Sequence, residues 1–159
     1  MKIGIVIPAH NEAMTIAKCL ASVRAAIEEL PSIIEVYTLV VLDSCTDNTE
    51  SIVKAAGIDY LCCNYQCVGQ VRNIGIRHAI TNDATWLACT DADSVVPIDW
   101  LVRQIEHISH QPTDMICGVV DIDSWAHLTP QTRKDYIAHY QDKMGHRHIH
   151  GANLSFSTK

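Results

Sequence analysis

Two aspartates, one residue apart, follow an apolar run and are the residues of this chain best placed to do chemistry. The run Trp86-Leu87-Ala88-Cys89 leads through Thr90 into Asp91-Ala92-Asp93. Such a run predicts a buried strand, and open α/β sheets bind their ligands at the carboxyl ends of strands. Two carboxylates this close repel each other unless a cation or hydrogen-bond donors hold them. Their oxygens suit Mg²⁺ or Mn²⁺ shared with a phosphate. Taken alone, however, Asp-x-Asp is common by chance and is more often a solvated loop or a helix cap.

The composition is that of a globular protein with an acidic balance. The chain has 159 residues, of which 48% are hydrophobic and 19% charged. This length predicts a single domain, residues 1–159, with a sizeable core. The formal net charge is −6 and there is no basic run, which argues against nucleic acid or an anionic membrane as a partner. A phosphate ligand would need a metal ion or local Arg and Lys side chains to offset this charge.

The seven cysteines bear on the compartment and on one possible metal site. Met1-Lys2 leads directly into the apolar run 3–7, which is too short for a signal core or a membrane span. We therefore expect no transmembrane segment, and reduced thiols in the cytoplasm. Cys62-Cys63-x-x-x-Cys67 has the spacing of half a zinc site, but no second pair matches it. Buried apolar thiols are the simpler interpretation.

Strands and helices alternate along the chain. The alternation predicts an α/β fold, a three-layer α/β/α sandwich around a mostly parallel central sheet. No GxGxxG and no glycine-lysine phosphate loop is present, so dinucleotide binding and ATPase activity lose support. Apolar runs predict strands near 2–8, 35–42, 58–63, 84–90 and 115–122. Apolar periodicity and capping residues predict helices over 13–30, 47–56, 69–79, 97–108 and 130–144, the second of which begins with a capping box, Asp47-x-x-Glu50.

Three histidines alternate near the end of the sequence, at His146, His148 and His150. In an extended segment this spacing puts all three side chains on one face. That face is either a metal site or, as is more common, a solvated polar surface.

Five segments in this order and spacing closely resemble the family 2 glycosyltransferases with the A-type nucleotide-sugar fold. The segments span residues 5–12, 41–49, 69–75, 90–93 and 151–156, and the resemblance covers residues 3–156. It implies a fold like that of the nucleotide-diphospho-sugar transferases. It also implies an enzyme that uses Mn²⁺ or Mg²⁺ to move a sugar, with inversion, from a nucleotide-diphosphate sugar to an acceptor. A UDP-sugar is the first candidate donor, and the acceptor stays open between a saccharide, a lipid and a small molecule.

The resemblance also implies roles for individual residues. Asp43, at the end of the second predicted strand, accepts a hydrogen bond from the base, and a carboxylate suits the imide N–H of uracil. Arg72 lies by the nucleotide. Asp91 lies near the ribose and the metal, and Asp93 ligates the metal that bridges the diphosphate. The turn after the first strand holds the base and ribose through Pro8, Ala9, His10 and Glu12.

The general base that an inverting transferase needs is not found by this resemblance. In the family it lies in an acid-rich loop a few dozen residues after Gly-Ala-Asn, whereas this sequence reaches only Lys159. We therefore expect a domain that lacks the usual C-terminal acceptor and base segment. Asp121 and Asp123, at the end of the predicted fifth strand, are candidates by position alone. The alternative is a catalytically incomplete module that binds a nucleotide sugar. Either protein would work in the cytoplasm, free or peripheral to the inner face of a membrane.

Overall fold

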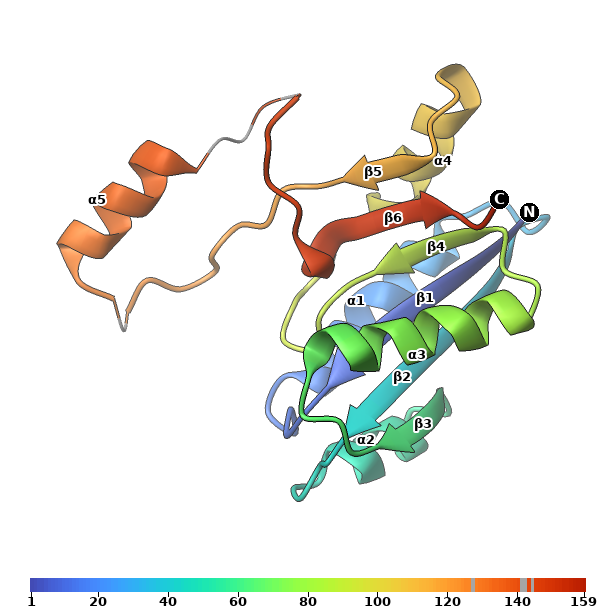
Figure 1. Ribbon diagram of the computed structural model, residues 1–159, viewed down its shortest axis with the longest axis horizontal. Coiled ribbons are helices and arrows are strands. Elements are labelled where there is room, and N and C mark those ends of the chain that lie inside the picture. Colours follow the sequence, from blue (N-terminus) through green and yellow to red (C-terminus); the bar gives the residue numbers. More distant parts are fainter. Residues whose placement is uncertain (127, 141–142, 144) are drawn as a thin grey trace.

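A computed structural model describes residues 1–126, 128–140, 143 and 145–159. Within these residues six strands form one sheet in the order β3-β2-β1-β4-β6-β5, with helices packed against it (Figure 1). The strands are β1 (Lys2–Ala9), β2 (Glu35–Asp43), β3 (Asp59–Cys63), β4 (Trp86–Cys89), β5 (Met115–Cys117) and β6 (Leu154–Ser157). The helices are α1 (Ile16–Glu28), α2 (Thr49–Ala55), α3 (Val68–Thr81), α4 (Trp100–His110), α5 (Pro130–His139) and the 3₁₀ turn η1 (Gly151–Asn153).

The sheet is mixed but mostly parallel. β1 lies at its centre and pairs in parallel with β2 and β4, and β2 pairs in parallel with β3. Among the strands of the described residues, only β6 runs the other way, antiparallel to both β4 and β5. Because β1, β2 and β4 are parallel, their carboxyl ends meet at one edge. The predicted α/β class and mostly parallel sheet are confirmed.

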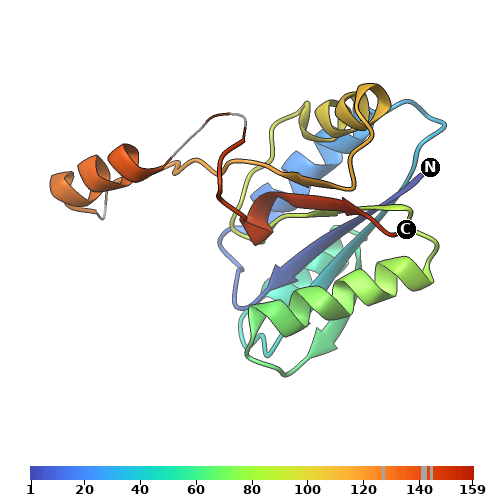
Figure 2. The same ribbon diagram turned by 45° about the horizontal axis from the view of Figure 1, so that its top comes forward.

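Alternating side chains of β1 build the two faces of the sheet. Ile3, Ile5 and Ile7 pack with α1, α2 and α4 in the larger hydrophobic cluster. Val6 points to the other face, where α3 lies. Figure 2 shows α3 on the side of the sheet opposite to α1 and α4. The predicted three-layer arrangement is therefore present.

Helix α3 lies very close to the sheet because of a glycine. A Cβ atom at Gly75 would lie 2.4 Å from Cγ1 of Val6 and 3.0 Å from Cγ2 of Val41. This close approach fixes where the first turns of α3 sit relative to the carboxyl ends of the strands.

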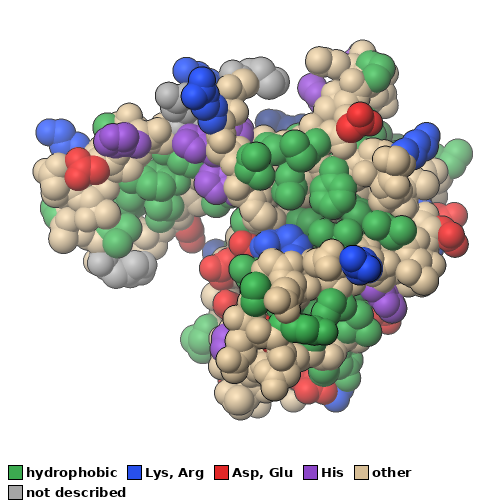
Figure 3. All heavy atoms as spheres, viewed as in Figure 1, with side chains coloured by type: hydrophobic (Ala, Val, Ile, Leu, Met, Phe, Trp, Pro, Cys, Tyr) green, Lys and Arg blue, Asp and Glu red, His purple; other side chains and the backbone are tan. Residues whose placement is uncertain are grey.

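Toward the β5 end of the same face, apolar side chains lie at the surface (Figure 3), and Met115 is 51% exposed.

Two predicted helix starts are wrong by one turn for the same reason. The Glu12 carbonyl accepts hydrogen bonds from the N–H groups of Thr15 and Ile16, so a separate turn precedes α1. Before α4, the Pro97 carbonyl accepts from the Trp100 N–H in a comparable turn. Pro97 and the exposed Ile98 therefore precede the helix that they were expected to open.

The predicted capping box at Asp47 and Glu50 does not form. The Asp47 carboxylate instead accepts from the backbone N–H and hydroxyl of Thr49 and from the N–H of Ala13. Glu50 pairs with Lys54 at 2.6 Å. Asp47 thus joins the turn after β1 to the start of α2 instead of closing a reciprocal cap.

The segment after β5 departs most from expectation. β5 ends at Cys117 and not at residue 122, because the next backbone donor, Gly118 N–H, bonds to the Asn153 carbonyl at the end of η1.

Thr129 caps α5 as predicted, accepting from the Thr132 N–H. The helix ends at His139, and Met144, the predicted end, lies outside the described residues. In both views α5 extends away from the sheet (Figures 1 and 2). Across the described residues, no helix has the length and apolar character needed to span a membrane.

Candidate functional site

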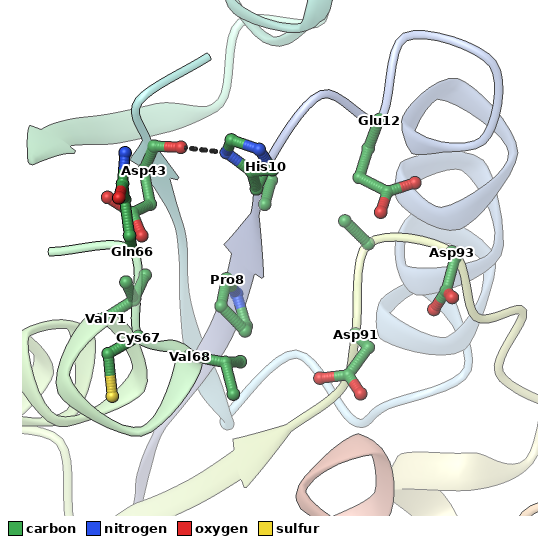
Figure 4. Close-up of a pocket in the computed structure, with 12 residues that line it drawn as sticks. Pro8, His10, Glu12, Asp43, Gln66, Cys67, Val68, Val71, Asp91 and Asp93 are labelled. Atoms are coloured by element: carbon green, nitrogen blue, oxygen red, sulfur yellow. Dashed lines mark hydrogen bonds between the residues drawn. The ribbon is translucent and has the colours of Figure 1, made fainter. Parts of the chain in front are cut away.

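A cleft of about 450 Å³ opens at the edge where β1, β2 and β4 end. Acidic side chains lie on both of its sides: Glu12, Asp91 and Asp93 on one, and Asp43 on the other (Figure 4). The structure thus brings together most residues singled out in the sequence. The cleft is lined by Pro8, Ala9, His10, Glu12, Asp43, Gln66, Cys67, Val68, Val71, Asp91, Ala92 and Asp93.

The acid pair follows β4 after the single residue Thr90, as the apolar run predicted. Asp91 is partly buried and its Oδ1 accepts a 2.6 Å charge-assisted hydrogen bond from Nη2 of Arg72. Asp93 is exposed, and its carboxylate has only a 3.4 Å contact with the Ser94 hydroxyl among the described residues. One acid is therefore held firmly and the other stays available to a ligand.

A buried thiol next to the acid pair reflects the negative charge there. Burial, together with the negative charges of Asp93, Asp91 and Glu12, raises the pKa of Cys19 to about 12. The Cys19 thiol donates to the Asp91 backbone carbonyl. Cys19 therefore stays protonated and can keep its hydrogen bond to the loop that carries Asp91. The negative charges of the three carboxylates add up at the position of this thiol.

Asp43 does more than end β2. Its side chain is almost fully buried, at 4% exposed, and Oδ1 accepts from the Tyr65 N–H at 2.8 Å and from the Ser44 hydroxyl. Burial alone would raise the pKa of this carboxyl, but hydrogen bonds from Tyr65, Ser44, Gln66 and Cys67 outweigh it and lower the pKa. Asp43 is thus ionised at neutral pH and anchors the loop that leads into α3.

Hydrogen bonds hold the turn after β1 to the end of β2, to the turn that follows β2 and to the start of α1. Nδ1 of His10 donates to the Asp43 backbone carbonyl at 2.6 Å, since a carbonyl can only accept. Asn11 accepts from the Thr46 N–H through its side-chain oxygen. The Glu12 carboxylate accepts from the Thr15 hydroxyl. This turn is therefore fixed relative to the end of β2 before any ligand binds.

Arg72 does not line the cleft, although the resemblance placed it by the nucleotide. Its side chain is 15% exposed and lies behind Asp91, which it contacts directly. The arginine therefore acts on the cleft through the carboxylate that it holds.

Asp121 and Asp123 lie in neither the strand nor the cleft. β5 ends before them, and both side chains are exposed. Asp121 accepts from the adjacent Ile122 N–H, and Asp123, which is 96% exposed, pairs with Lys18 of α1 at 3.7 Å. The expectation that they end the fifth strand is wrong, because the backbone leaves the sheet after Cys117.

The structure answers the two suggested metal sites in different ways. Cys62 and Cys67 are exposed and Cys63 is partly buried, so the interpretation of these thiols as buried is wrong for the first two. Throughout the described ranges, no three His, Cys, Asp or Glu side chains are placed to hold a metal ion by themselves. The rings of His146, His148 and His150 do share one face, and they stack in series with centroids 5.6 and 5.7 Å apart. Tyr140 stacks on His148. These contacts join ring faces and build an aromatic column that continues from Tyr140, at the end of α5.

Sequence reasoning missed one wall of the cleft, formed by Gln66, Cys67 and Val68. Gln66 has a φ of 49°, a left-handed conformation uncommon outside glycine. Asn11 and Ser44, which flank other cleft residues, share this conformation. Such backbone positions gather at functional sites, but no local residue pattern marks a Gln that adopts one.

Comparison with known proteins identifies the family. The sequence profile described as "Glycosyl transferase family 2" matches residues 4–156. The chain therefore belongs to glycosyl transferase family 2, as the five segments indicated. No curated protein matches it in sequence.

Several solved structures share the fold. Mannosyltransferase PcManGT from Pyrobaculum calidifontis, in complex with GDP-Man and Mn²⁺, superposes with a TM-score of 0.67 at 18% identity, over 98% of this chain and 44% of that one. S. aureus TarS 1-349 in complex with UDP-GlcNAc gives 0.63 at 21% identity, over 78% and 36%. Glucosyl-3-phosphoglycerate synthase from Mycobacterium tuberculosis in complex with UDP gives 0.58 at 15%, over 98% and 56%. This chain thus spans between about a third and three-fifths of these relatives.

Proposed function

We propose that this chain binds a nucleoside diphosphate sugar, a UDP-sugar first, together with Mn²⁺ or Mg²⁺. One observation carries the proposal: Asp91 and Asp93 face Asp43 across a single cleft of about 450 Å³. That volume is in the range of small-molecule sites. The two ends of the cleft suit the two ends of a nucleotide, a base at Asp43 and a diphosphate at the acid pair. Solved structures of the same fold are bound to UDP, UDP-GlcNAc and GDP-Man.

The donor atoms of the acid pair fit a hard divalent cation. Asp93 is exposed and nearly without partners, and Oδ2 of Asp91 accepts no hydrogen bond among the described residues. Asp93 and Oδ2 of Asp91 would hold the ion, with phosphate oxygens of the donor supplying further ligands. When bound, the ion would neutralise charge that develops on the leaving diphosphate.

The other end of the cleft would recognise the base. The ionised Asp43 is a hydrogen-bond acceptor, which suits the imide N–H of uracil. Gln66 lies beside it (Figure 4), and its amide can both donate and accept. The ribose would lie between the turn at His10 and Asp91.

We further propose that the bound sugar is transferred with inversion. An acceptor hydroxyl oxygen attacks the anomeric carbon, the bond from that carbon to the diphosphate breaks, and the nucleoside diphosphate leaves with the electron pair. The hydroxyl proton must pass to a base. The acceptor stays open between a saccharide, a lipid and a small molecule, and the cytoplasm is the proposed compartment.

A second candidate, a module that binds the donor without transferring it, has one observation in its favour. Each acid that lines the cleft is already assigned in this proposal or held by the turn: Asp43, Asp91 and Asp93 would serve the donor, and Glu12 accepts from Thr15. Asp121 and Asp123 lie outside the cleft. The described cleft therefore offers no further acid as a general base.

Calorimetry followed by a turnover assay separates these functions. We expect UDP to bind in Mn²⁺ or Mg²⁺ and to lose most of its affinity in excess chelator; equal affinity in both conditions would reject the proposed metal role. A panel of UDP- and GDP-sugars with saccharide acceptors then distinguishes transfer from slow donor hydrolysis. Binding without either reaction would identify the donor-binding module.

A further inference from the structure

The guanidinium of Arg72 rests on a glycine. A Cβ atom at Gly151 would lie 2.5 Å from Cζ of Arg72 and 2.7 Å from both Nη1 and Nη2. These near-equal distances place the glycine over the flat face of the guanidinium and not at its edge. A real side chain at position 151 would have to move the guanidinium, since contacts this short do not occur between unbonded atoms.

The turn that carries Gly151 cannot easily move instead. At its end, the Asn153 side chain accepts from Nε1 of Trp100 at 3.0 Å and donates to the Val119 carbonyl at 2.9 Å. The Gly118 N–H donates to the Asn153 carbonyl. A Cβ at Gly118 would lie 2.1 Å from the Asn153 side chain, so this packing is as tight as that at Gly151. The turn is thereby anchored to α4 and to the end of β5.

Unpartnered polar atoms gather at the same place. Among the described side chains, three buried polar atoms lack a hydrogen-bond partner: Nε of Arg72, Oγ1 of Thr90 and Nε2 of His150. Thr90 precedes Asp91 and His150 precedes Gly151. Unmade hydrogen bonds at buried groups reduce stability. The packing of Arg72 against Gly151 therefore leaves buried hydrogen-bonding groups unpaired. This cost in stability points to a role for the arrangement other than stability.

We propose that Gly151 is a positioning residue that holds Arg72 against Oδ1 of Asp91 and so leaves Oδ2 for the metal ion that would bind the diphosphate. This inference rests on the proposed function of the cleft. The guanidinium orients one acid of the pair and offsets part of its charge, while Asp93 stays exposed. We call this contact of Gly151 with the Arg72 guanidinium the seat. Only glycine can form it, because any Cβ at position 151 would occupy the space of the guanidinium.

Gly151→Ala is the direct test, and Gly69→Ala is its matched control. Among the described residues, no atom beyond its chain neighbours and its own helix turn lies within 4 Å of where a Cβ at Gly69 would be. We expect Gly151→Ala to weaken Mn²⁺-dependent UDP binding about 10- to 100-fold, the effect of losing a charge-assisted contact. Uridine alone should keep its affinity, because the base end of the cleft is unchanged. Gly69→Ala should match the wild type with both ligands. Equal losses of UDP and uridine would indicate general loss of packing and overturn the proposal, as would an unchanged Gly151→Ala.

A double-mutant cycle identifies Arg72 as the group through which Gly151 acts. In an Arg72→Ala background the atoms that a Cβ would meet are gone, so Gly151→Ala should cause no further loss of UDP affinity. Additive losses would show that Gly151 acts elsewhere. If Gly151→Ala alone does not fold, Arg72→Ala should restore folding to the double variant, and failure to do so would also overturn the seat.

A measurement without nucleotide keeps this proposal separate from the proposed function. The Nε–H of Arg72 is buried, so its NMR signal should exchange slowly with water in the wild type and in Gly69→Ala. Gly151→Ala should shift that signal and speed its exchange. If the wild type binds no UDP but shows this pattern, the proposed function fails and the seat stands. If the signal does not respond to Gly151→Ala, the seat is wrong whatever the chain binds.

Discussion

The Asp43 carboxylate accepts a 2.8 Å hydrogen bond from the backbone N–H of Tyr65. The acid that ends β2 therefore also fixes the loop before α3, which contributes Gln66 and Cys67 to the cleft. A residue expected only to contact the base thus has a structural role as well. Its substitution should change both stability and binding.

Asp43→Asn should lower the free energy of unfolding and weaken uridine binding together. The amide puts an N–H₂ group where an oxygen accepts backbone N–H groups, and losing hydrogen bonds to a charged group costs about 1.5–3 kcal/mol. Urea denaturation measures the first effect and calorimetry with uridine the second. Asp59→Asn, an exposed acid on the neighbouring strand β3, is the matched control. A folded Asp43→Asn with unchanged uridine affinity would remove Asp43 from base recognition.

The lowered pKa of Asp43 predicts the sign of a pH effect. Its pKa in the folded protein lies below the ordinary value of 3.8, so the ionised form stabilises the fold. That stabilisation is fully present above the unfolded pKa and is lost as the pH falls through the lower folded pKa. The stability difference between wild type and Asp43→Asn should therefore stay constant above about pH 5 and shrink below about pH 4. Thermal unfolding across this range measures it, and a difference that grows on acidification would contradict the assignment.

The edge of the sheet that carries the site could be predicted, because its signals are local. Apolar runs that stop at Asp43 and at Asp91 mark strands that end beside polar residues, and parallel strands bring those ends together. The Gln66 wall could not be predicted, since it depends on a left-handed backbone and on N–H groups held by Asp43 from 20 or more residues away. Asp121 was misplaced because the length of β5 is set by its pairing with the short strand β6, and not by the length of its own apolar run.

Gly75→Ala should destabilise the fold and so test the packing that places α3. The new Cβ would lie 2.4 Å from Cγ1 of Val6, and the buried strand residue has no room to retreat. Overpacking of this kind typically costs about 1–3 kcal/mol. Gly69→Ala, in the first turn of the same helix and in open space, should change the free energy of unfolding by less than about 0.5 kcal/mol. Equal denaturation midpoints for the two variants would show that α3 does not lie this close to β1.

Asp121→Ala and Asp123→Ala should leave donor binding and any turnover unchanged. Both side chains are exposed outside the cleft, and exposed ion pairs such as Lys18–Asp123 contribute at most about 1 kcal/mol. The measurement is UDP affinity and product formation with the best donor of the panel. A fall in turnover at unchanged UDP affinity would bring one of these acids back as the base.

Asp93→Ala should separate diphosphate binding from nucleoside binding. Asp93 is exposed and makes only a weak contact with Ser94 among the described residues, so its removal should not alter the fold. If it holds the cation, its loss acts through the phosphates, and UDP affinity in Mn²⁺ should fall by about 1.5–3 kcal/mol. Uridine, which has no phosphate, should bind Asp93→Ala and wild type alike. In excess chelator the two proteins should also bind UDP with the same reduced affinity, because the contact that Asp93 makes is then absent from both. Asp114→Ala, an exposed acid outside the cleft, controls for the change in net charge. Calorimetry with each protein under the three conditions decides the matter: a uridine loss as large as the UDP loss, or a UDP loss that persists in chelator, would show that Asp93 does not act through a metal.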